Sequence, residues 1–281
     1  MGSTGCVLRG GNLPSARMHS ALSIAGSDPT GGAGLQADLQ VFRHFGVHAA
    51  AVPTALTIQD GSHVQRVLPV FPSVVLEQLR TTLSAVRPHA IKIGMLASDD
   101  VVRNVLLALA PLDPAVPVVI DPVLASSDGT PLLEKRAYGS LRDLAHGRRL
   151  LTPNWPEMEI LVSADLPRKR DAEAAARELL DELVLDALLL KGGHREDDAD
   201  DLFVTREGAG GGASVCEWLP GERLPGPPVH GTGCALSAAI AALLARGEGL
   251  REAVLSARAY VRRGIEQAHA LANGARVLDF A

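Results

Sequence analysis

Short apolar runs recur along the chain, separated mostly by segments in which apolar residues repeat with helical periodicity. The runs cover residues 20–25, 47–53, 89–94, 117–121, 149–152 and 186–191. Apolar strands that alternate with helices in this way are typical of a parallel sheet covered by helices. The pattern therefore predicts an α/β protein with a doubly wound, mostly parallel sheet.

The pattern changes between residues 195 and 223. Two short strand candidates alternate there with acidic and glycine-rich loops, which predicts a hairpin at an edge of the sheet. Two long helical stretches follow, over residues 234–247 and 250–272, and Gly247 and Gly249 separate them. No internal repeat, coiled-coil heptad or long linker divides the chain.

Composition narrows the class of protein. The 281 residues are 47% hydrophobic and 21% charged, so the chain can bury a large core. We interpret residues 19–281 as one domain and residues 1–18 as a loosely ordered N-terminal extension. The net charge of −5 argues against a nucleic-acid-binding protein, because phosphate backbones attract clustered positive charge.

Cysteine usage and hydropathy bear on the cellular compartment. Cys6, Cys216 and Cys234 have no metal-ligand spacing and cannot all pair with one another, which favours a reducing compartment. The chain begins without a signal-peptide pattern, and no run approaches the ~18 apolar residues that span a bilayer. We expect a cytoplasmic protein with small, soluble ligands and no membrane partner.

A glycine-rich turn follows the first predicted strand. Residues 32–37 fit the pattern G-x-G-x-x-[GA] of dinucleotide-binding proteins, in which a helix N-terminus receives a pyrophosphate. The acidic residue that such proteins carry after the second strand is represented only by Asp60. A dinucleotide-dependent oxidoreductase therefore stays as a rival interpretation.

Asp38 falls on the buried side of the helix predicted to begin near Gly32. The apolar stripe of this helix consists of Leu35, Leu39, Phe42 and Phe45. An ionised carboxylate that is dry and unpaired is costly, so Asp38 either faces an open cleft or receives donors from a ligand or the backbone. The alternative is a carboxylate at the edge of the stripe, solvated or next to a helix terminus.

A second glycine turn, residues 230–234, precedes a helix predicted to begin at about Cys234. Gly231 and Gly233 permit backbone angles that let successive N–H groups converge on an anion. A thiol in this positive field can have its pKa lowered from about 8.5, which would make Cys234 a general base. The alternative is an ordinary small cysteine at a helix start.

Residues 150–161 combine a helix-start signature with a position at the end of a strand. Asn154 and Glu157 have the spacing of a capping box, and this is the simpler interpretation. Both nevertheless lie where open α/β sheets bind ligands, as do Asp121 and Lys191 after other apolar runs. Phosphoryl transfer requires groups of this kind: an anion nest, a lysine, two acids suited to Mg2+ and a candidate base. The chain contains no P-loop motif, so a different loop must hold the nucleotide.

Taken together, the motifs resemble the hydroxymethylpyrimidine and phosphomethylpyrimidine kinases of thiamin biosynthesis, in the ribokinase-like superfamily. They stand in the family's order between about residue 20 and about residue 268: IAGSDPTGGAGLQADL, IKIGML, IDPV, LTPNWPE, LLLKGGH and HGTGCALSAA. The resemblance implies a ribokinase-like three-layer α/β/α fold with a central, mostly parallel sheet and a small edge hairpin. It also implies ATP and Mg2+ as cofactors and a small pyrimidine as substrate.

The resemblance assigns roles to residues of this chain. Asp38 would bind the ring edge and amino group of the pyrimidine, Gln59 would face the ring, and the pocket would be lined by Gly26, Ala33, Met95 and Val123. Cys234 would accept the hydroxymethyl proton, and the anion hole would consist of Gly231, Thr232 and Gly233. The Mg2+ ion and the ATP phosphates would be attended by Asp121, Glu157, Asn154 and Lys191, with Arg258 where a Lys commonly meets the phosphates.

The leading hypothesis is a kinase that phosphorylates 4-amino-5-hydroxymethyl-2-methylpyrimidine and then its monophosphate. A pyridoxal, pyridoxine or pyridoxamine kinase is the alternative, because relatives share the scaffold. Residues 224–229 read LPGPPV and depart from the family pattern, so a non-catalytic pyrimidine sensor also stays open. Relatives are often dimers, which leaves a homodimer open as well.

Overall fold

A computed structural model describes residues 18–147, 150–193, 199–206 and 212–281. In this part of the chain the central sheet has nine strands in the order β3-β2-β1-β4-β5-β6-β7-β8-β9. The mutually parallel strands are β2 (His48–Gln59), β1 (Ser20–Ser27), β4 (Ala90–Ile93), β5 (Val118–Ile120), β6 (Leu150–Leu151) and β7 (Ala187–Leu190). Each of the six apolar runs forms one of these strands, so the predicted mostly parallel sheet is confirmed.

Antiparallel strands complete both edges of the sheet. At one edge, β8 (Asp201–Arg206) and β9 (Ser214–Leu219) form the predicted hairpin. At the other edge, β3 (Val64–Pro69) pairs with the second half of β2. The sequence pattern predicts neither β3 nor the continuation of β2 to Gln59, because these segments mix polar with apolar residues.

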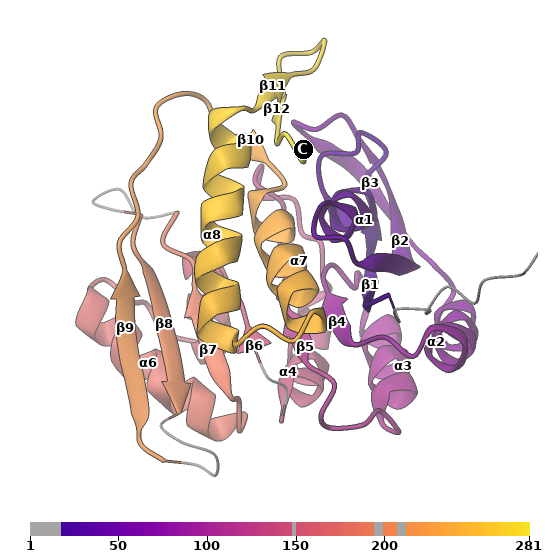
Figure 1. The fold of residues 1–281 in the computed structure, drawn as a ribbon, viewed down its shortest axis with the longest axis horizontal. Helices are drawn as coiled ribbons and strands as arrows, with labels where there is room; N and C mark the ends of the chain where they lie inside the picture. Colours follow the sequence, from indigo (N-terminus) through magenta and orange to yellow (C-terminus); the bar gives the residue numbers. More distant parts are fainter. Residues whose placement is uncertain (1–17, 148–149, 194–198, 207–211) are drawn as a thin grey trace, which may run out of the picture.

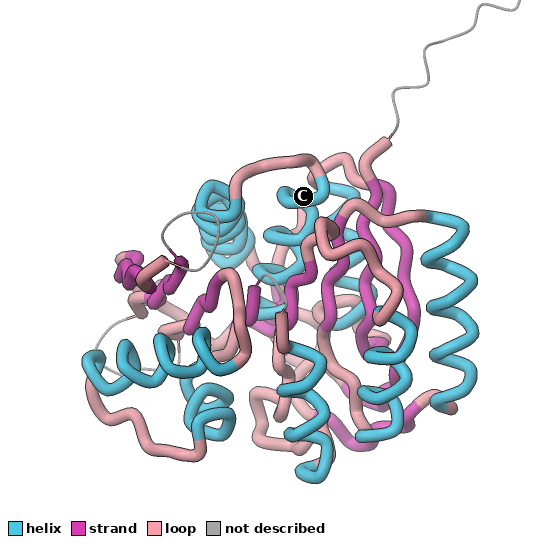
Figure 2. The backbone as a smooth tube through the Cα atoms, turned by 90° about the horizontal axis from the view of Figure 1, so that it is seen from below, coloured by secondary structure: helices cyan, strands magenta, loops and turns pink. Residues whose placement is uncertain are grey.

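Helices cover both faces of the sheet, as the three-layer prediction requires (Figure 1). One face carries α1 (Gly34–His44), α7 (Thr232–Ala245) and α8 (Leu250–Glu266). The other carries α2 (Pro72–Val86), α3 (Asp99–Leu109), α4 (Tyr138–Ala145), α5 (Trp155–Val162) and α6 (Lys169–Glu182), with a 3-10 turn η1 (Lys135–Ala137) before α4. Figure 2 shows the strands between these two groups of helices.

The alternation of side chains along each strand divides the core in two. In β4, Ile91 and Ile93 face the core under α2–α6, whereas Ala90 faces the core under α1, α7 and α8. Lys92, two residues after Ala90, therefore lies on the face of α1 and α7, where it is fully buried. A charged residue inside this core needs a partner, which the site described below supplies.

A small second sheet joins the segment before α7 to the end of the described chain. Its order is β10 (Val229–His230), β12 (Arg276–Val277) and β11 (His269–Ala270). The predicted helix over residues 250–272 is wrong at its end, since α8 ends at Glu266. Beyond it the chain turns back through a hydrogen bond of 2.8 Å between the N–H of Leu271 and the carbonyl of Ala275.

The remaining expectations concern the ends of the chain. Residues 1–17, which hold most of the expected extension and Cys6, lie outside the described residues. Met18, the last residue of that expected extension, is 63% exposed. Among the helices that the structure describes, none combines the length and apolar character that crossing a membrane requires.

Candidate active site

The carboxyl ends of the parallel strands meet the start of α7 at one edge of the sheet. Asp121 follows β5 and its N–H donates to the carbonyl of Ile93 in β4 (2.8 Å). Lys191 follows β7 and its N–H donates to the carbonyl of Pro153 beyond β6 (2.9 Å). A Cβ placed on Gly233 would lie 3.5 Å from Nζ of Lys191 and 3.8 Å from Oδ2 of Asp121. The second glycine turn and the strand ends thus form one site.

Lys191 lies between two carboxylates at this edge. Its ammonium is 2.7 Å from Asp121 and 3.9 Å from Glu157, and all three side chains are largely buried. Burial raises the pKa of Glu157 to about 7; Lys191 opposes the rise and Asp121 adds to it. The cluster therefore has two acids for one cation, and a second positive charge would stabilise it.

Asn154 and Glu157 form the capping box that their spacing predicts. The side-chain oxygen of Asn154 accepts the N–H of Glu157 (2.9 Å), and Glu157 accepts the N–H of Asn154 (2.7 Å). This fixes the Glu157 carboxylate beside Lys191 at the start of α5. The capping interpretation is confirmed, and a contact of Asn154 with ATP stays a prediction.

Helix α7 begins at Thr232, two residues before the predicted start. Gly231 precedes it with a φ of +83°, a left-handed conformation that glycine adopts without strain. The first N–H groups of a helix have no intrahelical acceptor, and Gly231 has no side chain to cap them. In the described part of the chain, Gly231 thus leaves the first N–H groups of α7 uncapped by a side chain, as the predicted anion hole requires.

Cys234 lies in the first turn of α7 and is half-buried as a residue. The expected lowering of its pKa is wrong: burial raises the pKa of the thiol, and Asp38 and Asp121 raise it further. Lys92 and the backbone N–H of Gly34 oppose this effect. Desolvation of the thiolate therefore outweighs the nearby donors, and the thiol is protonated near neutral pH.

The structure shows which protein groups Asp38 contacts. Its carboxylate is fully buried and bonds Nζ of Lys92 at 2.8 and 3.0 Å, while the hydroxyl of Ser23 donates to it at 2.5 Å. Burial lowers the pKa of Lys92, but Asp38 more than compensates, so the pKa of Lys92 is raised and its ammonium keeps its charge. Burial raises the pKa of Asp38, and the contacts with Lys92 and Ser23 oppose that rise. Asp38 is thus buried with a lysine partner, and a contact of Asp38 with the pyrimidine stays a prediction.

Most of the expected pocket residues do come together. Met95 belongs to an apolar cluster with Ala55 and Leu132, against which Val123 packs. A Cβ on Gly26 would lie 2.7 Å from the sulfur of Met95. These residues form an apolar wall beside the first glycine turn.

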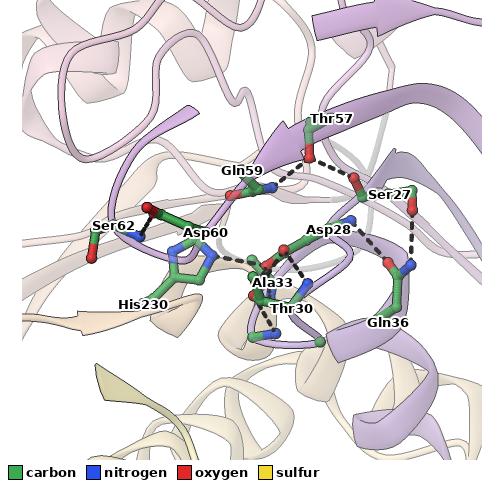
Figure 3. A network of polar contacts seen from close by, with 12 residues as sticks. Ser27, Asp28, Thr30, Ala33, Gln36, Thr57, Gln59, Asp60, Ser62 and His230 are labelled. Atoms are coloured by element: carbon green, nitrogen blue, oxygen red, sulfur yellow. Dashed lines mark hydrogen bonds and ion pairs between the residues drawn. The ribbon is translucent and has the colours of Figure 1, made fainter. Parts of the chain in front are cut away.

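Gln59 joins the pocket through a chain of hydrogen bonds. Its amide nitrogen donates to Thr57 (2.7 Å), and the hydroxyl of Thr57 donates to the carbonyl of Ser27 (2.8 Å), as Figure 3 shows. Ala33 is the N-cap residue of α1 at the other side of the turn. Contacts of Gln59 and Ala33 with a pyrimidine ring stay predictions.

Comparison with known proteins decides the family. A family model described as phosphomethylpyrimidine kinase matches residues 28–279. The chain belongs to the phosphomethylpyrimidine kinase family. It is 39% identical over 257 residues to the hydroxymethylpyrimidine/phosphomethylpyrimidine kinase of Salmonella typhimurium, covering 91% of this chain and 94% of the relative. The Escherichia coli enzyme of the same name is 37% identical over the same shares.

Solved structures include both phosphomethylpyrimidine kinases and pyridoxal kinases. An ADP complex of Bacillus subtilis pyridoxal kinase has a TM-score of 0.83 and 29% identity, covering 94% of this chain and 97% of its own. The phosphomethylpyrimidine kinase of Clostridium difficile has a TM-score of 0.76 and 30% identity, covering 88% and 99%. Membership of the phosphomethylpyrimidine kinase family leaves the dinucleotide interpretation of the first turn without support.

Arg258, expected at the phosphates in this phosphomethylpyrimidine kinase scaffold, has protein partners instead. Its Nε donates to Asp201 (2.7 Å), and its Nη2 donates to the carbonyls of Leu219 (3.0 Å) and Pro220 (2.9 Å). The other oxygen of Asp201 accepts the N–H of Gly192 (2.8 Å). These contacts tie Arg258 to the backbone next to Lys191, and a contact of Arg258 with the ATP phosphates stays a prediction.

Two features of the site are not singled out by sequence patterns. Lys92 has a weak signal, as the one charged residue in the apolar run 89–94, and a buried cation requires a counterion. The contact between Asp28 and His230, which are 2.9 Å apart, has no signal in the sequence, because the two residues are far apart along the chain. In the described part of the chain, no group of three or more His, Cys, Asp or Glu side chains could hold a metal ion alone.

Proposed function

We propose that this chain is an ATP-dependent kinase that phosphorylates 4-amino-5-hydroxymethyl-2-methylpyrimidine and then its monophosphate, in thiamin biosynthesis. The position of Cys234 carries the proposal. On one side its sulfur faces the N–H of Gly34 in the first turn, beside the apolar wall of Met95. On the other side, Gly233 lies against Lys191 and Asp121. An acceptor in the apolar pocket and a phosphoryl donor at Lys191 would meet at Cys234.

The proposed chemistry is in-line attack of the substrate hydroxyl on the γ-phosphoryl group. Cys234 accepts the hydroxyl proton, and the backbone N–H groups at Gly231, Thr232 and Gly233 stabilise the negative charge that develops on the phosphoryl oxygens. Lys191 holds the phosphates of ATP, with Asn154 at the same edge. Because burial raises the pKa of Cys234, the reactive thiolate fraction and the rate should rise with pH above neutrality.

The residues at Lys191 fit a magnesium ion. Asp121 and Glu157 supply the oxygen ligands that Mg2+ prefers, and when both are ionised they carry one negative charge more than Lys191 neutralises. Mg2+ usually keeps several waters and binds through one or two carboxylates plus substrate phosphates, which agrees with a site that has only two acids. When bound, the ion would neutralise charge on the ATP phosphates.

Product analysis tests the proposal. The protein is incubated with Mg-ATP and, separately, the hydroxymethylpyrimidine, its monophosphate and pyridoxal, and products are identified by mass spectrometry. A diphosphate from the pyrimidine supports both steps, and no phosphorylated pyrimidine overturns the assignment. Cys234→Ala should lower kcat strongly with little change in pyrimidine affinity, whereas Cys216→Ala, the matched control outside the site, should keep wild-type kinetics.

Pyridoxal phosphorylation is the second candidate, favoured by one observation. The pyridoxal kinase of Bacillus subtilis and that of Staphylococcus aureus are similar to this chain at TM-scores of 0.83 and 0.82. Product from pyridoxal alone would move the assignment to this activity. Tight binding of the pyrimidine without any product would favour a sensor instead.

The proposal extends to assembly and location. We treat residues 19–281 as one domain, since α7 and α8 pack on the sheet built by the preceding residues. We place it in the cytoplasm, where a kinase has direct access to ATP.

A homodimer is supported by exposed apolar side chains near edge strand β3: Leu56, Leu68 and Phe71 are 51%, 42% and 79% exposed. Light scattering of wild type and Phe71→Lys, with Leu107→Lys on α3 as control, tests this surface.

A further inference from the structure

The first glycine turn, residues 28–34, and the start of α7 are joined by a contact that the proposed chemistry does not use. Nε2 of His230 lies 2.9 Å from Oδ2 of Asp28, and the side chains are 21% and 2% exposed. His230 directly precedes Gly231, the N-cap residue of α7. The contact therefore links the turn beside the pocket to the predicted anion hole.

On its own side, the Asp28 carboxylate fixes the shape of the first turn (Figure 3). It accepts the N–H of Thr30 (2.9 Å), the hydroxyl of Thr30 (2.8 Å) and the N–H of Ala33 (2.9 Å). Burial would raise the pKa of Asp28, but hydrogen bonds from His230 and Thr30 outweigh it and lower the pKa. Asp28 is thus an ionised acceptor for every one of these donors.

On the other side, the His230 ring is confined by close packing. A Cβ on Gly32 would lie 2.9 Å from Cδ2 of His230 and 2.7 Å from Cγ1 of Val277. Val277 is also the strand partner of His230 in the small sheet. The His230 ring therefore has little room to shift against the turn, and a displacement of the ring would also displace Gly231.

We propose that Asp28 and His230 are a positioning pair for phosphoryl transfer. This inference rests on the proposed function. Through the turn, Asp28 sets the position of Ala33 and of the Gly34 N–H that faces Cys234. Through the backbone, His230 sets the position of the N–H groups at the start of α7. The pair thus fixes the distance between the acceptor hydroxyl and the groups that stabilise the transferring phosphoryl, without touching either.

The test separates kcat from KM in three variants of the full chain. His230→Phe keeps the ring and removes the hydrogen bond; its kcat should fall roughly 10- to 100-fold, as small misplacements of reacting groups do, with KM for both substrates within about twofold. His230→Gln places an amide N–H near the position of Nε2 and should recover most of kcat. Asp28→Asn removes one acceptor oxygen from the pair and should also lower kcat, with KM for both substrates within about twofold. The control is His269→Phe, an exposed histidine of the small sheet, which should keep wild-type kcat.

The following results would contradict the positioning role. A kcat of His230→Phe within twofold of wild type, a loss confined to KM, or an equal loss in His230→Gln would show that the contact positions nothing. If His230→Phe does not fold, the comparison of His230→Gln and Asp28→Asn with wild type decides in the same way. The two failures are distinguishable. Wild-type protein that phosphorylates no substrate would contradict the proposed function itself, whereas an active wild type with the variant results above would contradict only the positioning role.

Discussion

Gly231 packs directly against the backbone of Gly32. A Cβ built on Gly231 would lie 1.8 Å from the carbonyl oxygen of Gly32, and Gly231 has a φ of +83°. The two glycine turns, each recognisable in the sequence as an anion-binding pattern, are in contact with one another. Any side chain at residue 231 would push the first turn away from the start of α7.

Gly231→Ala should therefore lower both stability and activity. The left-handed conformation alone costs an alanine about 1–2 kcal/mol, and separation of the turns should reduce kcat at least tenfold. Gly247→Ala is the matched control, because Gly247 has a φ of +87° with no atom within 4 Å of a Cβ. It should lose a similar part of the unfolding free energy and keep its kcat. Equal kcat losses in both variants would contradict the steric explanation.

Asp38→Asn should destabilise the protein by roughly 3–5 kcal/mol, because it leaves the buried ammonium of Lys92 without its carboxylate. Urea unfolding measures the loss. Replacing both partners, as Asp38→Leu with Lys92→Met, should recover much of it, since apolar groups need no counterion. A stable Asp38→Asn protein with a raised KM for the pyrimidine would instead support Asp38 as a direct substrate ligand.

The Glu157 carboxyl should make the metal-free protein less stable as pH rises. Its folded pKa of about 7 lies above its ordinary value of 4.5, so the folded state holds a proton that the unfolded chain releases between these pH values. Stability from this group is fully present below pH 4.5 and is lost as pH rises toward 7, by on the order of 1–3 kcal/mol.

Glu157→Gln should flatten that dependence, because it keeps an oxygen for the N–H of Asn154 but does not titrate. Unfolding at pH 5 and pH 8 in the presence of EDTA compares the two proteins. Relative to wild type, the variant should be more stable at pH 8 than at pH 5, and it should lose activity with Mg-ATP because the proposed magnesium ligand is gone. A parallel pH dependence in both proteins would mean that Glu157 is ionised throughout.

Arg258→Met should raise KM for ATP severalfold while leaving KM for the pyrimidine unchanged. The guanidinium donates to Asp201, and Asp201 accepts the N–H of Gly192 beside Lys191. Loss of the guanidinium should therefore disturb the proposed ATP site at Lys191 and leave the pyrimidine pocket unchanged. Arg251→Met is the control on the same helix, since Arg251 pairs with Glu217 at the surface. If Asp201→Asn leaves KM for ATP unchanged while Arg258→Met raises it, Arg258 acts on the phosphates directly.

The sequence is sufficient for the parallel part of the sheet, because the short apolar runs identify buried strands. It also predicts which edge carries the site, because the carboxyl ends of those strands share an edge. It places Asp38 on a buried helix face but does not show what lies across from it. Lys92 is that partner, and it comes from a strand that is separated from α1 by β2, β3 and α2. Pairing between distant residues has no local signal.

The same limit explains the error in the pKa of Cys234 and the unforeseen partner of Arg258. The local environment of Cys234, a helix start after glycines, favours a lowered pKa, but burial by the rest of the fold decides the direction. The guanidinium of Arg258 bonds Asp201 from the edge hairpin, a residue far from it in the sequence. In each case a contact between distant segments outweighs the local pattern.

The small sheet has a consequence for synthesis of the protein on the ribosome. The first glycine turn emerges early, whereas His230 and Val277, which pack against Gly32, are added only after most of the chain. At translation rates of about 5–20 residues per second, the turn waits on the order of ten seconds or longer for these contacts. A nascent chain can thus build much of its sheet while still unable to bring acceptor and phosphoryl group together, so catalytic competence should arrive late and abruptly.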